Sequence, residues 1–171
     1  MLSMKKFYIF LDIDGVLYDW DWIIEEVNSG RQKRGGLFEK FKPDSMLALN
    51  MLIEKLNKIY DVRLVISSTW RSDLTNCIKV LKNNGLCYNK KVEATPFSDP
   101  SKRGEQILEF LKDKHNYDFV IIDDEMFDFL KFFHRSKIIK TEMYHSALSV
   151  KQIKNYLDNK TDLQSVVKTG F

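Results

Sequence analysis

Short apolar runs alternate with segments of helical periodicity along most of this chain, and this alternation constrains the fold more than any other feature. Runs of this length with few polar residues are typical of strands buried on both faces, as in a parallel sheet. The runs that we interpret as strands, the third being weaker than the others, occupy residues 6–11, 62–66, 86–92, 119–122 and 137–140.

The segments between these runs carry helix signals. Pro43 opens an apolar repeat with helical spacing, and Ser72, Ser101 and Ser149 are each suited to cap a further helix. Strands that alternate with helices imply a parallel sheet with right-handed crossovers, which is an α/β, doubly wound fold. The helices that we expect cover residues 23–28, 43–59, 72–83, 101–111, 126–133 and 149–157.

Length and composition fit one compact domain. The chain has 171 residues, 44% of them hydrophobic and 30% charged, and its formal net charge is +3. We assign residues 1–160 to a single α/β domain and residues 161–171 to a C-terminal tail. The mild basicity is compatible with an anionic substrate but too weak to establish nucleic-acid binding by itself.

Nothing in the sequence points to a membrane or to a disulfide scaffold. No apolar run approaches the roughly 20 residues that cross a bilayer. The apolar run after Lys5 and Lys6 is too short for a secretory signal. The two cysteines, Cys77 and Cys87, lack metal-binding spacing, so we expect reduced thiols. These features predict a cytoplasmic protein without a membrane partner.

Chemically active residue types gather just after the predicted strands, where open α/β sheets bind their ligands. A lysine, Lys102, lies before the helix that precedes the fourth strand. Together these are the residue types that a phosphoryl-transfer site needs. Asp12 and Asp14 follow the first strand, Ser67 and Ser68 the second, and Asp123, Asp124 and Asp128 the fourth.

The clustered carboxylates indicate metal-assisted phosphoryl transfer. Several carboxylates that converge on one cleft repel each other and require a cation, and oxygen ligands favour Mg²⁺. Asp12 is then the natural nucleophile, Asp14 can protonate the leaving group and activate water, and Gly15 lets the backbone turn away. Lys102 would add a positive charge, and a serine hydroxyl would donate to the phosphoryl oxygens.

These residues resemble the sequence motifs of the haloacid dehalogenase (HAD) superfamily, in that family's order and over most of the chain, residues 7–140. The resemblance implies a Rossmann-like HAD fold in which the first aspartate is the nucleophile and the second is the acid and base. Residues 12–17 match motif I, Ser67 or Ser68 motif II, Lys102 motif III, and Asp123-Asp124 with Asp128 motif IV.

The resemblance also implies how the metal is held. In the family, Mg²⁺ binds the first aspartate, the backbone carbonyl of the second and an aspartate of motif IV, which correspond here to Asp12, Asp14 and Asp124. Asp123 and Asp128 are candidates for a ligand or for a neighbour that orients one. The resemblance therefore implies a phosphatase, a phosphoric monoester hydrolase with Mg²⁺ as cofactor and a phosphorylated molecule as substrate.

A narrower resemblance concerns the substrate. Residues 67–71, Thr95-Pro96 and residues 102–105 are similar to a small HAD subgroup that includes domains of bacterial multidomain RNA-repair proteins. This similarity implies a nucleotide or a nucleic-acid terminal phosphate as the favoured substrate.

Three assignments have alternatives. Either Ser67 or Ser68 faces the phosphate, and the other caps the following turn. Arg103 is adjacent to Lys102 and could do similar work. Arg71 either contacts substrate or is a surface charge.

Residues 18–41 leave no room for a full cap domain, so we expect at most a small cap-like insertion and an open site that admits a large substrate. The aromatic and basic residues of this segment either stack on and attract a nucleotide or pack the loop on the sheet. They are Trp20, Trp22, Arg31, Lys33 and Arg34.

Two other functions use similar residues. A non-enzymatic phospho-receiver also combines aspartates, a hydroxyl, a lysine and Mg²⁺, but its acid pair comes early in the chain and its lysine late. A phosphotransferase or phosphomutase acting on small metabolites shares the scaffold, but it must exclude water, and a minimal cap does not favour that. Nothing in the sequence specifies an oligomeric state.

Overall fold

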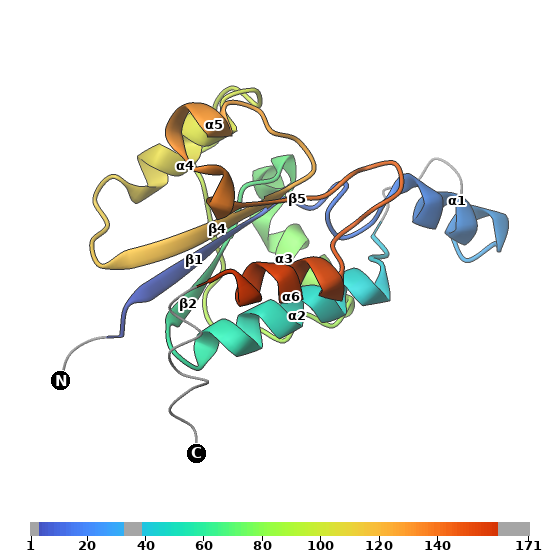
Figure 1. The fold of residues 1–171 in the computed structure, drawn as a ribbon. Helices are drawn as coiled ribbons and strands as arrows, with labels where there is room; N and C mark the ends of the chain where they lie inside the picture. Colours follow the sequence, from blue (N-terminus) through green and yellow to red (C-terminus); the bar gives the residue numbers. More distant parts are fainter. Residues whose placement is uncertain (1–3, 33–38, 161–171) are drawn as a thin grey trace, which may run out of the picture.

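A computed structural model describes residues 4–32 and 39–160, and Figure 1 shows their arrangement. A five-stranded sheet in the order β3-β2-β1-β4-β5 forms its centre, and all neighbouring strands are parallel. The α/β class is therefore confirmed. The strands are β1 (Lys6–Leu11), β2 (Asp61–Ile66), β3 (Glu93–Ala94), β4 (Tyr117–Asp123) and β5 (Ile138–Lys140).

The central strand β1 positions the site. It pairs with β2 on one side and β4 on the other, and Leu11 is level with both Ile66 and Ile122. The chain builds β2 and β3 on one side of β1 and then crosses to build β4 and β5 on the other, so the topological switch point lies beside β1. The residues that follow these three strands therefore meet at one place on the carboxyl edge of the sheet.

Helices cover both faces of the sheet, which confirms the doubly wound arrangement (Figure 1). Alternate side chains of β1 enter two separate cores, Phe7 and Ile9 on one face and Tyr8 and Phe10 on the other. Residues of α2, α3 and α6 complete the first core, and residues of α4 and α5 complete the second. The helices are α1 (Trp20–Asn28), α2 (Pro43–Asn57), the 3₁₀ turn η1 (Thr69–Asp73), α3 (Leu74–Asn83), α4 (Arg103–Leu111), α5 (Phe129–Phe132), the 3₁₀ turn η2 (Arg135–Lys137) and α6 (Val150–Asp158).

The predicted third strand over residues 86–92 is wrong, because β3 covers only Glu93–Ala94. Tyr88 supplies the physical reason. Its hydroxyl accepts a hydrogen bond from the backbone nitrogen of Leu64 and donates one to the backbone oxygen of Val62, each over 3.2 Å. A side chain thus satisfies backbone groups of β2 that a neighbouring strand would otherwise have bonded.

The predicted helix starts are partly right. Ser149 caps α6 as expected, with a reciprocal capping box. Ser72 does not cap α3, because the 3₁₀ turn after β2 continues to Asp73, whose side chain is the cap. Ser101 does not cap α4 either. The N-cap position of α4 is Lys102, which makes no side-chain cap bond.

The insertion over residues 18–41 carries α1, which stands apart from the helices that cover the sheet (Figure 1). Its base is fixed by the buried carboxylate of Asp19. That carboxylate lies 2.9 Å from Lys42 Nζ and accepts a hydrogen bond from the backbone nitrogen of Ala147 over 3.1 Å. One buried carboxylate therefore ties the start of the insertion to two distant parts of the chain.

The aromatic and basic residues of the insertion differ in their burial and in their partners. Trp22 packs against the larger core, whereas Trp20 is exposed. Arg31 pairs with the buried carboxylate of Glu26 over 2.8 Å. Lys33, Arg34 and the tail over residues 161–171 lie outside the described residues.

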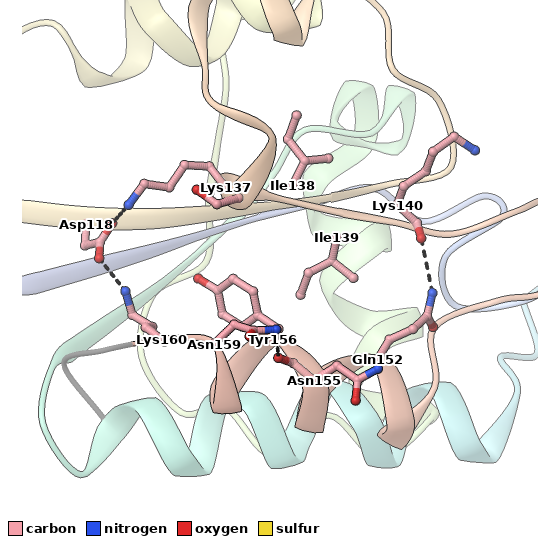
Figure 2. Close-up of a pocket in the computed structure, with 11 residues that line it drawn as sticks. Asp118, Lys137, Ile138, Ile139, Lys140, Gln152, Asn155, Tyr156, Asn159 and Lys160 are labelled. Carbon is pink, nitrogen blue, oxygen red and sulfur yellow. Dashed lines mark hydrogen bonds and ion pairs between the residues drawn. The ribbon is translucent and has the colours of Figure 1, made fainter. Parts of the chain in front are cut away.

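A cavity of about 600 Å³ lies between β5 and α6 at the edge of the sheet (Figure 2). Asp118 forms ion pairs of 2.5 Å with both Lys137 and Lys160 at one end of it. At the other end, Gln152 Nε2 donates to the backbone oxygen of Lys140 over 3.1 Å. Because this side chain covers a carbonyl of the edge strand, β5 is less available for pairing with another chain.

Within the described part of the chain, no helix is long and apolar enough to cross a bilayer. Cys77 is buried and Cys87 is exposed, and both are free thiols. Burial raises the pKa of Cys77 to about 12, so this thiol stays protonated and inert at neutral pH.

Candidate active site

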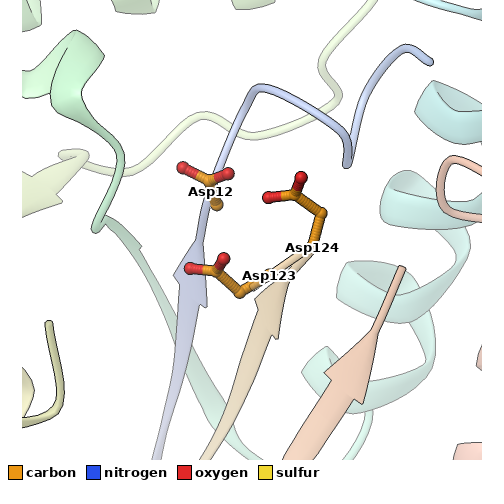
Figure 3. Close-up of side chains that lie close together, drawn as sticks. All are labelled: Asp12, Asp123 and Asp124. Atoms are coloured by element: carbon orange, nitrogen blue, oxygen red, sulfur yellow. The ribbon is translucent and has the colours of Figure 1, made fainter. Parts of the chain in front are cut away.

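Three aspartates from the ends of two neighbouring strands converge at the switch point (Figure 3). Asp12 follows β1, Asp123 ends β4, and Asp124 is the next residue. One carboxylate oxygen from each lies within 4.8 Å of the others. Asp12 and Asp123 are buried, and Asp124 is partly exposed. The sequence predicted all three as site residues, and the parallel register of β1 and β4 brings them together.

Burial and mutual repulsion disfavour ionisation of the three carboxyl groups in this cluster. Burial is the main cause that raises the pKa of Asp12 and raises the pKa of Asp123 well above its ordinary value. For Asp124, burial and then the charge of Asp12 raise the pKa to about 7. Three carboxyl groups that resist ionisation at such close range form a site where a cation stabilises the ionised state.

The guanidinium of Arg103 forms ion pairs with two aspartates of the cluster. Its Nη1 lies 2.8 Å from Asp12 Oδ1 and 2.7 Å from Asp123 Oδ2. The side chain of Lys102, which the sequence favoured for this role, is 53% exposed and pairs with Glu105 over 3.5 Å. The reason is where α4 begins: Lys102 is its N-cap, whereas Arg103 is the first helical residue and reaches the sheet.

The donor set fits a hard divalent cation such as Mg²⁺. It offers only carboxylate oxygens, and Asp12 Oδ1 is buried without a hydrogen bond of good geometry. The turn after β1 requires glycine at position 15, because its φ is +70° and a Cβ there would lie 2.4 Å from Asp124 Oδ2. Only glycine lets the turn after β1 pass this close to the Asp124 carboxylate.

Asp128 lies elsewhere and has other partners. Its carboxylate accepts hydrogen bonds from the backbone nitrogens of Gly104, over 2.6 Å, and Glu105, over 3.1 Å. Asp128 therefore caps the first turn of α4, which otherwise lacks a cap bond from its own N-cap residue. The structure does not bring this predicted ligand into the aspartate cluster. It makes Asp128 a support for Arg103, which begins the same helical turn.

Asp14 is partly exposed and has its own hydrogen-bond partners. The hydroxyl of Tyr18 and the indole nitrogen of Trp70 both donate to Asp14 Oδ1, the latter over 3.1 Å. The negative charge of Asp14 also contributes to the raised pKa of Asp12. The two acids of motif I therefore lie close enough to interact electrostatically, while their carboxylates have different partners.

The structure distinguishes the two serines after β2. Ser67 Oγ is buried and has no hydrogen-bond partner among the described residues. Ser68 is the N-cap of η1, and its side chain accepts a hydrogen bond from the Trp70 backbone nitrogen over 3.4 Å. The Ser68 hydroxyl also bonds to Asp12, which lowers the pKa of the Asp12 carboxyl group. The Ser68 hydroxyl is therefore adjacent to the cluster, and Ser67, whose backbone nitrogen bonds to the oxygen of Leu11 just before Asp12, retains unused hydrogen-bonding capacity.

Arg71 braces the turn that carries these serines. Its Nη1 donates to the backbone oxygens of Ser67 and, over 2.6 Å, Ser68, and its Nη2 donates to Gln106 Oε1. Burial and the nearby charge of Arg103 lower the pKa of Arg71 to about 10. The guanidinium thus lies beside the site but uses its terminal nitrogens within the protein.

Two phenylalanines that the sequence did not single out lie over these arginines. The Arg71 guanidinium lies 4.8 Å from the ring centre of Phe97, and that of Arg103 lies 4.5 Å from the ring centre of Phe127. The two rings remain 56% and 40% exposed. Phe127 also adopts a φ of +39°, which is rare for a bulky residue and is enriched at functional sites. Single aromatic residues in loops give no periodic signal, so these were missed.

The all-parallel α/β sheet with an aspartate cluster beside its central strand fits a HAD domain, and the match to a HAD family model makes a HAD-type phosphohydrolase the class of this protein. The chain belongs to the family described as the HAD domain in Swiss Army Knife RNA repair proteins, whose model matches residues 8–161. No curated protein and no solved structure matches the chain significantly.

Proposed function

We propose that this protein is a Mg²⁺-dependent phosphatase that forms an aspartyl-phosphate on Asp12. The observation that carries the proposal is the buried Asp12 carboxylate, which lies against Asp123, Asp124 and the guanidinium of Arg103. Asp12, Asp124 and Asp123, with the backbone carbonyl of Asp14, would hold the ion. When bound, Mg²⁺ would offset negative charge on the phosphate and on the carboxylates.

The two acids of motif I would divide the chemistry. An oxygen of Asp12 attacks phosphorus, the bond from phosphorus to the leaving oxygen breaks, and Asp14 gives its proton to that oxygen. Asp14 then takes a proton from the water that attacks the phosphorus of the aspartyl-phosphate. This second step releases phosphate and restores both acids.

Donors around Asp12 are suited to the charge on the transferred phosphoryl group. Ser67 has a buried hydroxyl without a partner in the described chain, and Ser68 already bonds to Asp12. Arg103 provides a fixed positive charge whose position is set by Asp12 and Asp123. Donors held in place before the reaction lower the barrier because they do not have to reorganise as charge develops.

For the substrate, we propose a nucleotide or a nucleic-acid end that carries a terminal phosphate. The chain belongs to a family of HAD domains found in RNA repair proteins, and this membership supports a nucleic-acid substrate. Phe97 and Phe127 support it as well, because each ring is exposed and lies over an arginine beside Asp12. Stacking of a base on an aromatic side chain is worth about 1–3 kcal/mol.

We also propose that residues 18–41 act as a small cap-like insertion. α1 is nine residues long and stands apart from the sheet, and Trp20 on it is exposed (Figure 1). An insertion of this size would leave the site open to a polymer end, in keeping with the proposed substrate.

A phosphate-release screen tests the proposal. The purified protein is assayed with Mg²⁺ and with EDTA against nucleotides, 3′- and 5′-phosphorylated oligonucleotides, phosphopeptides and sugar phosphates. We expect Mg²⁺-dependent release from the nucleotide or oligonucleotide group and none from the Asp12→Asn variant. Turnover of sugar phosphates alone would refute the substrate class, and preferential transfer to an added alcohol would indicate a phosphotransferase.

A further inference from the structure

We infer that Tyr18 and Trp70 are positioning residues that determine which oxygen of Asp14 carries the transferable proton. This inference rests on the proposed function, in which Asp14 is the general acid. Both residues donate to the same oxygen, Oδ1. Within the described part of the chain, no protein donor bonds to Oδ2, so the two oxygens of this carboxyl group have different environments.

The chemistry of the donors favours one tautomer of protonated Asp14. An indole N–H can only donate, so the oxygen opposite Trp70 must accept in both protonation states of Asp14. The Tyr18 hydroxyl donates to that same oxygen, and a carbonyl oxygen accepts two hydrogen bonds better than the hydroxyl oxygen of a carboxylic acid does. Two donors on Oδ1 therefore favour the tautomer of protonated Asp14 that carries its proton on Oδ2.

Neighbouring aromatic rings hold both donors in place. Tyr18 is buried and stacks on Phe41 with ring centres 6.1 Å apart, and Phe41 contacts Trp70 at 5.9 Å. The backbone nitrogen of Trp70 bonds to Ser68, and that of Phe41 bonds to Asn84 over 2.8 Å. The donors are thus fixed by contacts from two separate parts of the chain, which limits the rotation of the Asp14 carboxyl group.

Tyr18 and Phe41 also lie at the two ends of the 18–41 insertion. The stacked pair that closes the base of the insertion is therefore the same pair that holds a donor on Asp14. The orientation of the Asp14 carboxyl group is consequently set by Tyr18 of the insertion and by Trp70 of the turn after β2.

The proton balance of the first step defines the test. As the bond from phosphorus to Asp12 forms and the bond to the leaving oxygen breaks, the proton on Asp14 Oδ2 moves to that oxygen. An alkoxide leaving group requires this proton, whereas p-nitrophenolate is stable without it. The value of kcat/KM reports only steps up to the first irreversible one, so it isolates formation of the aspartyl-phosphate from its hydrolysis.

The experiment compares Tyr18→Phe and Trp70→Phe with the wild type on the nucleotide or phosphorylated oligonucleotide that the screen selects and on p-nitrophenyl phosphate. We expect kcat/KM to fall about tenfold or more for the selected nucleotide or oligonucleotide and less than threefold for p-nitrophenyl phosphate. Taking the ratio of the two substrates cancels any loss of folded protein. Tyr156→Phe, which removes a tyrosine hydroxyl at the distant β5 edge, is the matched control and should leave the ratio unchanged.

The outcomes separate the two proposals. If both substrates lose activity equally in the Tyr18 and Trp70 variants, these side chains are merely structural and the inference is wrong, while the phosphatase assignment stands. If the wild type hydrolyses neither these esters nor a phosphorylated oligonucleotide in the presence of Mg²⁺, the proposed function fails and the inference fails with it.

Discussion

The guanidinium of Arg103 lies 2.8 Å from the carboxylate of Asp12, and both side chains are buried. This pair places a permanent positive charge against the proposed nucleophile. It also offsets the charge of two of the three close carboxylates, because Arg103 contacts both Asp12 and Asp123.

Replacing Arg103 should therefore be far more damaging than replacing its neighbour. Arg103→Ala is expected to lower kcat/KM by roughly a hundredfold or more, in line with loss of a preorganised charge, while Lys102→Ala changes it less than about threefold. Steady-state assays on the best substrate of the screen measure both. Comparable losses for the two variants would contradict the assignment.

Asp124 and Asp128 form a second matched pair. Asp124→Asn should weaken Mg²⁺ binding at least about tenfold, because it removes a charged oxygen donor. Asp128→Ala should leave Mg²⁺ affinity nearly unchanged but lower the free energy of unfolding by about 0.5–2 kcal/mol, because it removes the cap of α4. Isothermal titration with Mg²⁺ and urea unfolding separate the two effects. A large loss of Mg²⁺ affinity on changing Asp128 would make it a ligand after all.

The two exposed phenylalanines predict substrate selectivity. Phe97→Leu and Phe127→Leu should each raise KM about fivefold or more for a nucleotide, the lower end of the range for loss of base stacking. A phosphate ester without a base, such as glycerol phosphate, serves as control, and its KM should be unchanged. Equal effects on both substrates would show that the rings support the arginines rather than bind a base.

Asp118 predicts how stability depends on pH. Burial alone would raise its pKa, but hydrogen bonds from Lys137 and Lys160 outweigh that effect and hold the pKa below its ordinary value of 3.8. A lowered pKa in the folded state stabilises the fold above the unfolded pKa, and this contribution disappears as the pH falls through the folded value.

Asp118→Asn should accordingly lower the free energy of unfolding by about 1–3 kcal/mol at pH 7, the scale of hydrogen bonds to a charged group. The difference from the wild type should shrink as the pH falls below about 4. Urea titrations across this range measure it, and a difference that stayed constant with pH would show that the ion pairs do not contribute.

The sequence predicted the aspartate cluster because its residues directly follow strands, and parallel strands of one sheet end at the same edge. Asp12, Asp123 and Asp124 needed only the strand assignment and the switch-point rule. The choice between Lys102 and Arg103 depended on which residue begins α4, and helix boundaries are uncertain by about one or two residues in sequence patterns.

Other features depended on contacts between distant residues. Tyr88 satisfies the outer edge of β2 with its hydroxyl, which the apolar pattern over residues 86–92 does not encode. The capping of α4 by Asp128, which lies 24 positions from Gly104, likewise has no local signal. Phe97 and Phe127 are recognisable only once the arginines beneath them are placed.

Trapping the covalent intermediate tests the central claim most directly. The protein is mixed with its best substrate and Mg²⁺, quenched in acid within milliseconds, reduced with borohydride and digested for mass spectrometry. An aspartyl-phosphate on Asp12 predicts conversion of that residue, and not of Asp14, Asp123 or Asp124, to homoserine. Turnover of substrate with no modification at Asp12, or with modification at another aspartate, would contradict the account.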